Sequence, residues 1–203
     1  MKIFKNTIIP REYRGSAIAI GNFDGVHRGH QKVFNQAKKY AKKNKIKFGV
    51  LTFTPLPVMF FNRNVKNCRL VSENKKFQLF EKHGVDFVIN IKFNKIFSKI
   101  TAIEFVKNII FKKINPRLIF VSNNFKFGNK RKGNVHLLKK FSKKYNYRLI
   151  NILAFKHKAK VVSSTLIRKS LKNGNLDLAN TLLSRTWFIE GIVQKGKKIG
   201  KKL

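Results

Sequence analysis

The segment AIGNFDGVHRGHQ (19–31) holds the side chains best suited to chemistry in this 203-residue chain. It combines three glycines, an acid and two histidines: Gly21, Gly25, Gly29, Asp24, His27 and His30. A glycine-rich turn before a helix directs free backbone N–H groups and the positive helix end at an anion. The imidazoles add directional hydrogen-bond donors. These residues favour a nucleotide-phosphate site.

Two other interpretations of this segment remain open. His27 and His30 could bind a metal ion from one helical turn, but such a site normally needs a third protein ligand, and the chain is poor in acids. The segment could also be an Asp-Gly turn with incidental histidines. It matches neither the G-x-G-x-x-G fingerprint nor the P-loop.

A second set of polar residues lies near the C-terminus, in SSTLIR (163–168). Its serines, Ser163 and Ser164, precede a predicted helix, and Thr165 and Arg168 are three positions apart. Hydroxyl groups, free N–H groups and a guanidinium therefore lie on one face. Arginine suits a phosphate chain because its planar fork donates two hydrogen bonds. The alternative is a plain helix N-cap with a solvent-facing arginine.

The elements that must position these residues alternate along the chain. Short apolar runs predict strands at 16–20, 48–53, 86–91, 116–122 and 147–153. Amphipathic or capped runs predict helices at 30–44, 72–84, 101–113 and 134–145, and two short helices follow at 164–171 and 176–183. This order predicts an α/β fold with a doubly wound, Rossmann-like parallel sheet. Ligands of such sheets bind beyond the carboxyl ends of the strands, so we expect the site in the loops after Ile20, Phe53 and Val121.

The residue pattern changes near residue 185, where the alternation of predicted strands and helices ends. WFIEGIVQKGKKIGKKL (187–203) has glycines and no helical period, and is typical of the first hairpin of a β-domain. We expect one domain over residues 1–184 and the start of a second, cut short, over 185–203. About eighteen residues cannot bury a core of their own.

Composition narrows the function classes. The 46 Lys and Arg against 8 Asp and Glu give a formal net charge of +38, which attracts phosphate-rich partners. The lysines are spread along the whole chain, however, so a nucleic-acid-binding module is only the alternative. No run reaches the 18 to 20 apolar residues of a membrane span. One cysteine and no export signal favour a reducing cytoplasm. No feature indicates an oligomeric state.

The first segment also resembles a known family. GNFDGVHRGH (21–30) is similar to the signature of the HxGH nucleotidylyltransferase superfamily, and with Gln31 it resembles the bacterial FAD synthetases, bifunctional riboflavin kinase/FMN adenylyltransferases. Further segments match in order and spacing: LTFTPLPVMFF (51–61), VSNNFKFGNKRKGN (121–134) and SSTLIR. In LTFTPLPVMFF, Thr54 and Leu56 replace the usual acid and histidine. The run from Gly191 resembles the entry to the riboflavin kinase barrel.

The resemblance implies a site and a reaction. It implies transfer of AMP from ATP to FMN, giving FAD and pyrophosphate, with Mg²⁺ arriving on ATP and with no riboflavin kinase activity in this chain. The implied catalytic residues are His27, His30 and Arg168. The implied ATP- and phosphate-binding residues are Gly21, Asn22, Phe23, Asp24, Gly25, Gly29, Ser163, Ser164 and Thr165. The implied nucleotide or flavin loops contribute Phe53, Pro55, Asn124, Phe125, Phe127, Gly128 and Arg131. The alternative within this class is another HxGH transferase, acting on pantetheine phosphate, nicotinamide mononucleotide or glycerol phosphate.

Overall fold

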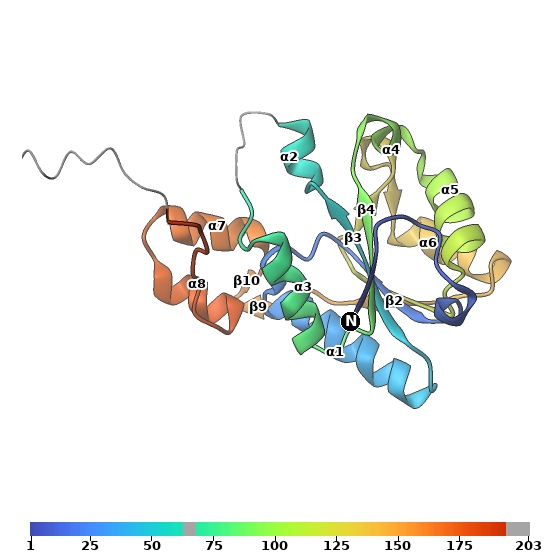
Figure 1. Cartoon of the computed structure of the whole chain (residues 1–203), viewed down its shortest axis with the longest axis horizontal. Coiled ribbons are helices and arrows are strands. Elements are labelled where there is room, and N and C mark those ends of the chain that lie inside the picture. The colour runs from blue at the N-terminus through green and yellow to red at the C-terminus, as the bar shows by residue number, and fades with distance from the viewer. Residues whose placement is uncertain (63–67, 194–203) are drawn as a thin grey trace, which may run out of the picture.

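A six-stranded parallel sheet forms the centre of the computed structural model, which describes residues 1–62 and 68–193 (Figure 1). Its strand order is β1-β4-β3-β2-β5-β8. The strands are β1 (Lys2–Phe4), β2 (Ala17–Ile20), β3 (Phe48–Thr54), β4 (Phe87–Lys92), β5 (Leu118–Ser122) and β8 (Arg148–Ile152). The chain moves from β2 to one side through β3 and β4, and to the other through β5 and β8, which confirms the predicted doubly wound topology. The edge strand β1 was not predicted.

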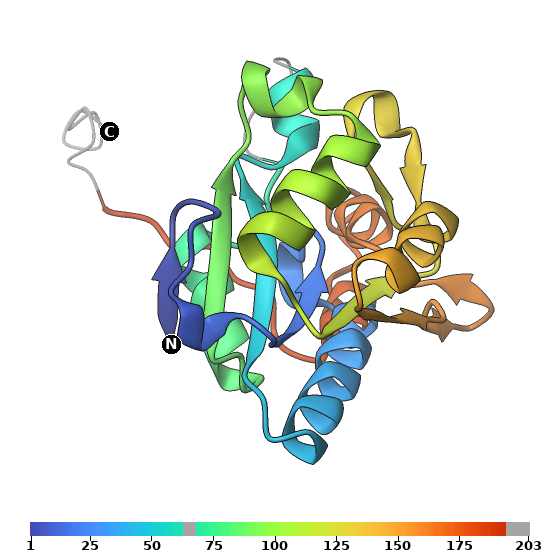
Figure 2. The same ribbon diagram turned by 90° about the vertical axis from the view of Figure 1, so that its right-hand side faces the viewer.

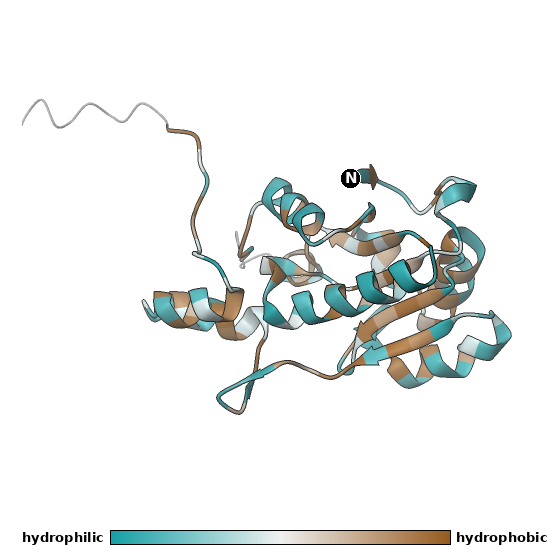
Figure 3. Cartoon of the chain, turned by 90° about the horizontal axis from the view of Figure 1, so that it is seen from below, coloured by the Kyte–Doolittle hydropathy of each residue, from teal (hydrophilic) through white to brown (hydrophobic). Residues whose placement is uncertain are grey.

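Helices cover both faces of the sheet, as Figures 1 and 2 show. Side chains of α1 (Arg28–Lys43) and α3 (Glu73–Lys82) pack in the core on one face. The other core receives α5 (Ala102–Glu104), its continuation η3 (Phe105–Ile114) and α6 (Val135–Lys144). Strand β2 contributes side chains to both cores, because Ala17 and Ala19 face the first core while Ile18 and Ile20 face the second. The strands are accordingly apolar and the outer helix surfaces polar (Figure 3).

Side-chain caps fix where several helices begin. The predicted capping box is present at α5, where Thr101 Oγ1 accepts from the Glu104 amide and the Glu104 carboxylate accepts from the Thr101 amide. Beyond it the predicted helix 101–113 continues as the π-helical turns of η3. Hydrophobic periodicity predicts a helix there but does not distinguish this wider winding from an α-helix.

A smaller helical layer lies beside the α1 and α3 side of the molecule. It consists of α7 (Ser164–Lys172) and α8 (Leu176–Leu183), which share a third apolar cluster with Leu70 and Trp187. Short elements complete the chain: α2 (Pro57–Phe61), α4 (Lys95–Lys99), η1 (Arg11–Tyr13), η2 (Asp24–Val26), η4 (Asn129–Arg131), and the hairpins of β6 (Lys126–Phe127) with β7 (Gly133–Asn134) and β9 (Lys156–His157) with β10 (Lys160–Val161). In the described part of the chain no helix is long and apolar enough to cross a membrane.

The expected second domain stays a prediction. Residues 185–193 form no strand, and residues 194–203 lie outside the described chain. Trp187 contacts α8 and the segment before α3, because its amide donates to Asn180 Oδ1 at 2.7 Å and its Nε1 donates to the Leu70 carbonyl at 2.9 Å.

Candidate active site

The turn between β2 and α1 has an unusual backbone. Phe23, Gly25 and Val26 have φ angles of 50°, 78° and 42°. For phenylalanine and valine this left-handed region is unfavourable, so the surrounding structure must hold the turn in place.

Four carbonyl groups of the turn accept hydrogen bonds from side chains that come from other elements or from α1. Asn22 O accepts from Thr52 Oγ1 at 3.1 Å, and Asp24 O accepts from Ser164 Oγ at 2.9 Å. Gly25 O accepts from Arg185 Nη2 at 2.7 Å, and Val26 O accepts from Gln31 Nε2 at 2.9 Å. The donors are Thr52, Ser164, Arg185 and Gln31. These bonds fix the geometry of the turn before any ligand is present.

Gly25 can be tested against a matched glycine. A Cβ at Gly25 would lie 2.7 Å from Leu70 Cδ1, whereas a Cβ at Gly174, which has a similar φ of 71°, would meet no atom within 4 Å. We expect Gly174→Ala to cost about 1 kcal/mol of unfolding free energy for its backbone alone, and Gly25→Ala to cost about 2 to 3 kcal/mol. Urea unfolding of both variants measures this difference, and equal losses would contradict the packing at Gly25.

The two histidines of the motif stack on each other at the start of α1. Their ring centroids are 3.6 Å apart, and the Phe23 ring meets His30 edge-on at 5.1 Å. His27 Nδ1 accepts from the His30 amide at 3.3 Å, so the neutral ring of His27 carries its proton on Nε2. Burial lowers the pKa of His27 to about 4, and burial with the neighbouring His27 holds the pKa of His30 well below its usual 6.5. Both rings are therefore neutral donors at pH 7.

The lowered pKa of His27 makes the stability of the protein depend on pH. Between pH 6.5 and about 4 the unfolded chain binds a proton that the folded chain rejects, so the free energy of unfolding falls as pH falls. We expect His27 to contribute a loss of about 2 kcal/mol between pH 7 and pH 5. Urea unfolding of the wild type and His27→Gln at both pH values tests this expectation. A pH-dependent loss as large in the variant as in the wild type would refute it.

Asp24 lies at the centre of the contacts between the turn and two other segments. Its carboxylate is buried, accepts from the Leu70 amide at 3.0 Å and pairs with Arg168 Nη2. Arg168 also donates through Nε to the Cys68 carbonyl. Burial raises the pKa of the Asp24 carboxyl, and the Arg168 guanidinium and the Leu70 amide oppose that rise. Asp24 thus joins the turn to α7 and to the segment before α3.

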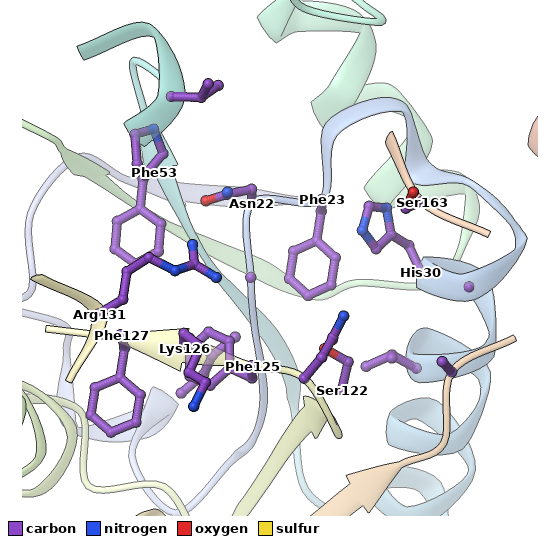
Figure 4. A pocket seen from close by; sticks show the side chains of 18 of the residues that line it. Asn22, Phe23, His30, Phe53, Ser122, Phe125, Lys126, Phe127, Arg131 and Ser163 are labelled. Carbon is purple, nitrogen blue, oxygen red and sulfur yellow. The ribbon is translucent and has the colours of Figure 1, made fainter. Parts of the chain in front are cut away.

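A cavity of about 790 Å³ opens at the carboxyl ends of β2, β3 and β5, where the sequence placed the site (Figure 4). Most of the predicted site residues line it: Gly21, Asn22, Phe23, His27, Gly29, His30, Phe53, Asn124, Phe125, Phe127, Gly128, Arg131 and Ser163. Residues from four separate segments of the chain therefore meet around one space.

The two halves of this cavity differ in chemistry. One half is aromatic. The ring centroids of Phe53 and Phe97 are 5.6 Å apart, and Phe125 stacks on Phe127 with a centroid distance of 5.4 Å. The other half is formed by the glycines and histidines of the turn. Arg131 lies on the aromatic side, beside Phe53 and Phe127, and extends its guanidinium into the space (Figure 4). Among the described residues that line the cavity none is acidic, whereas Lys126, Lys130 and Arg131 are basic. Such a lining suits a ligand with a flat ring system and an anionic part.

Some predicted residues lie outside the lining of this cavity. Asp24 and Pro55 line a separate small cavity, and Gly25 is buried in the turn. Ser164 and Arg168 donate to Asp24, and Thr165 is exposed. The structure therefore places Ser164 and Arg168 in the support of the turn, and their predicted contact with phosphate stays a prediction.

Sequence reasoning did not assign Gln31 and Arg185 to the site. Gln31 Nε2 donates to the carbonyls of Val26 and Leu183, at 2.9 and 3.0 Å, and so joins the turn to α8. Its position directly after His30 was the available signal. Arg185 carried no such signal, because its partner Gly25 lies 160 residues away.

Comparison with known proteins agrees with this geometry. The FAD synthetase family model matches residues 9–166, which is most of the chain. The chain belongs to the FAD synthetase family.

Curated relatives of this FAD synthetase family member are longer than the chain. It is 42% identical over 189 residues to the bifunctional riboflavin kinase/FMN adenylyltransferase of Buchnera aphidicola subsp. Schizaphis graminum, covering 93% of this chain and 61% of that protein. Its identity to the protein of the same description from Haemophilus influenzae is 35%, covering 94% of this chain and 62% of that protein. The chain thus spans about three fifths of these relatives.

The fold also recurs among solved structures. A crystal structure described as a macrolide-efflux protein from Streptococcus pneumoniae superposes with a TM-score of 0.80 at 25% identity, covering 92% of this chain and 62% of that chain. This likeness supports the arrangement of the sheet and helices.

Proposed function

We propose that the chain is an FMN adenylyltransferase, which transfers AMP from ATP to FMN and releases pyrophosphate. The observation that carries the proposal is the cavity of about 790 Å³ in which the histidine pair and an aromatic surface face one space, in a member of the FAD synthetase family. ATP and FMN each combine a flat ring system with phosphate, which matches the two halves of the cavity.

In the proposed reaction a phosphate oxygen of FMN attacks the α-phosphorus of ATP. A new bond forms between that oxygen and the α-phosphorus, and the bond from the α-phosphorus to the oxygen bridging to the β-phosphorus breaks. Pyrophosphate leaves with the bonding electrons. The chain then has two tasks, to align the reacting oxygen and to stabilise charge on the phosphoryl oxygens.

The turn residues perform the second task in this proposal. The His27 Nε2–H donates to a phosphoryl oxygen as a neutral donor, because its Nδ1 is already occupied by the His30 amide. His30, with Asn22 and Gly29, lines the same side of the cavity. Lys126, Lys130 and Arg131 add positive charge at the opposite loop.

Arg168 has two roles in this proposal. Its Nη2 pairs with Asp24, and its side chain is 29% exposed, which leaves it accessible to the β- and γ-phosphates. Ser164 and Thr165 complete this proposed phosphate contact at the start of α7.

Magnesium enters this proposal as part of the substrate Mg-ATP. Within residues 1–62 and 68–193 no group of three or more His, Cys, Asp or Glu side chains could hold a metal ion. The nearest acid, Asp24, is engaged by Leu70 and Arg168. Magnesium commonly binds through substrate phosphates with few protein carboxylates, so ATP can bring its own ion.

The aromatic half of the cavity is the proposed place of the flavin ring. Phe53, Phe97, Phe125 and Phe127 offer flat apolar surface there, and Asn124 lines the cavity with an exposed side chain. An amide can read an adenine edge or a ribose hydroxyl, which is its proposed role.

The domain division follows from the same proposal. Residues 1–184 form the adenylyltransferase domain and residues 185–203 begin a riboflavin kinase-like β-domain. A cytoplasmic location fits the lone Cys68.

Incubation of the chain with Mg-ATP and FMN, followed by chromatography, tests the function. FAD and pyrophosphate in equal amounts are the expected products. Pantetheine phosphate, nicotinamide mononucleotide and glycerol phosphate serve as alternative acceptors, and preferential use of one of them would overturn the assignment to flavin. A chain that makes no dinucleotide but binds nucleic acid, with an affinity that falls steeply with salt, would support the basic binding module instead.

A further inference from the structure

The side chain of Lys76 is a buried cation near the turn between β2 and α1, and it does not line the cavity of about 790 Å³. Lys76, on α3, is 5% exposed, although lysines are almost never buried without a partner. The other lysines of α3 reach solvent more readily, Lys75 being half-buried and Lys82 exposed. A buried ammonium costs several kcal/mol unless it is compensated, so its surroundings need an explanation.

The contacts of Lys76 lead to the turn through one hydroxyl group. Lys76 Nζ lies 3.4 Å from Thr52 Oγ1, and Thr52 Oγ1 lies 3.1 Å from the Asn22 carbonyl oxygen. An ammonium group can only donate, so the Thr52 oxygen accepts from Lys76 and must direct its own hydrogen elsewhere. The Asn22 carbonyl receives that hydrogen. Lys76 therefore sets the direction of the bond that holds Asn22.

Two carboxylates face the same ammonium. Asp24, Glu73, Arg69 and Lys76 line one small cavity of about 10 Å³, which has room for no more than about one water molecule. The Glu73 carboxylate is itself held by Asn90 Nδ2 at 3.0 Å. Burial lowers the pKa of Lys76 to about 8, Glu73 and Asp24 oppose this, and Arg69 adds to it. Lys76 is thus charged at neutral pH and balances the buried Asp24 and the half-buried Glu73.

We propose that Lys76 is a positioning residue of the site, which fixes the Asn22–Gly25 turn through Thr52 and through the charge that it presents to Asp24. The proposal rests on the proposed adenylyltransferase function. It matters because Asn22 and Phe23 line the cavity while the backbone after Asn22 is left-handed at Phe23 and Gly25. A turn in this conformation shifts when one of its holding bonds is lost, and a small shift misplaces the phosphate donors.

The proposal predicts a pH dependence of catalysis. Above pH 8 the neutral amine of Lys76 can accept a hydrogen from Thr52, so the bond to Asn22 is no longer enforced. We expect kcat/KM for FAD formation to fall above pH 8 in the wild type. Glu73, Asp24 and Arg69 are the charged groups that face Lys76, and Arg168 faces Asp24 from α7.

Four variants test the proposal. Lys76→Met keeps an unbranched side chain of similar volume and removes the charge, and Thr52→Val removes the hydroxyl. We expect each to lower kcat/KM about tenfold, and the double variant to lose clearly less than the product of the two single losses, because both substitutions break the chain of bonds through Thr52. Lys82→Met, on the exposed side of the same helix, is the control and should match the wild type.

Stability and pH separate positioning from a purely structural role. A buried ion replaced by an apolar side chain of similar volume often leaves stability unchanged or raised, so we expect Lys76→Met to melt within a few degrees of the wild type. Its kcat/KM should lack the fall above pH 8. If Lys76→Met and Thr52→Val keep the wild-type kcat/KM, or if their losses multiply in the double variant, the proposal is wrong.

Binding of Mg-ATP distinguishes failure of this inference from failure of the proposed function. A wild-type chain that forms no FAD would overturn the function. Calorimetry with Mg-ATP then decides on Lys76, since Lys76→Met and Thr52→Val should bind about tenfold more weakly than wild type and Lys82→Met. Equal affinities would overturn the role of Lys76 alone.

Discussion

Replacement of His30 by alanine is expected to lower the rate of adenylyl transfer by about 10² to 10³ while the fold is kept, the range for loss of one preorganised donor. The His30 ring is stacked on His27 and packed against Phe23, so its position is set before substrate binds. Its Nδ1 atom is buried without a hydrogen-bond partner among the described residues. Such an unsatisfied group is costly in the free protein and is characteristic of a functional site.

Single-turnover formation of FAD from FMN and Mg-ATP measures this effect. His136→Ala is a suitable control, because His136 is an exposed histidine on α6 and does not line the cavity. It should react at the wild-type rate. If His30→Ala reacts as fast as the control, His30 is not a catalytic residue. If the variant loses both its activity and its cooperative melting transition, the role of His30 is structural.

The fold could be predicted because its signals are local. The inner strands are largely apolar on both faces, as a sheet covered on both sides requires, and this pattern is visible in runs such as SAIAI and LIFV. The Thr101–Glu104 capping box fixes a helix start from residues three apart. The position of the site then followed, because parallel strands bring the loops after Ile20, Phe53 and Val121 to one edge.

The support of the site could not be predicted, because its contacts join residues far apart in the sequence. Lys76 stands in a lysine-rich helix and is indistinguishable by type from its exposed neighbours, yet it is buried against Thr52. The sequence predicts Arg168 as a phosphate ligand, and only the structure shows its pairing with Asp24, 144 residues earlier. A residue type indicates what a side chain can bind, while its partners depend on the assembled fold.

Replacement of Asp24 by asparagine is expected to lower the free energy of unfolding by about 2 to 3 kcal/mol. Asp24 is 3% exposed, and its carboxylate serves the Leu70 amide and Arg168 together. An asparagine amide can still accept from Leu70, but its NH₂ group then faces the guanidinium, so two donors oppose each other. The loss is below that of a fully buried pair, because Arg168 is 29% exposed and water can screen it.

Urea unfolding of Asp24→Asn, Arg168→Met and the double variant tests the pair. Since Arg168 loses its partner once Asp24 is changed, the double variant should lose less stability than the two single variants added together. Glu81→Gln is the control, because Glu81 pairs with the Met1 amino group at an exposed position and should cost under about 1 kcal/mol. Losses that add fully would mean that Asp24 and Arg168 act separately. Arg168 would then act only as a phosphate ligand. In that case Arg168→Met would raise KM for Mg-ATP and would leave the free energy of unfolding unchanged.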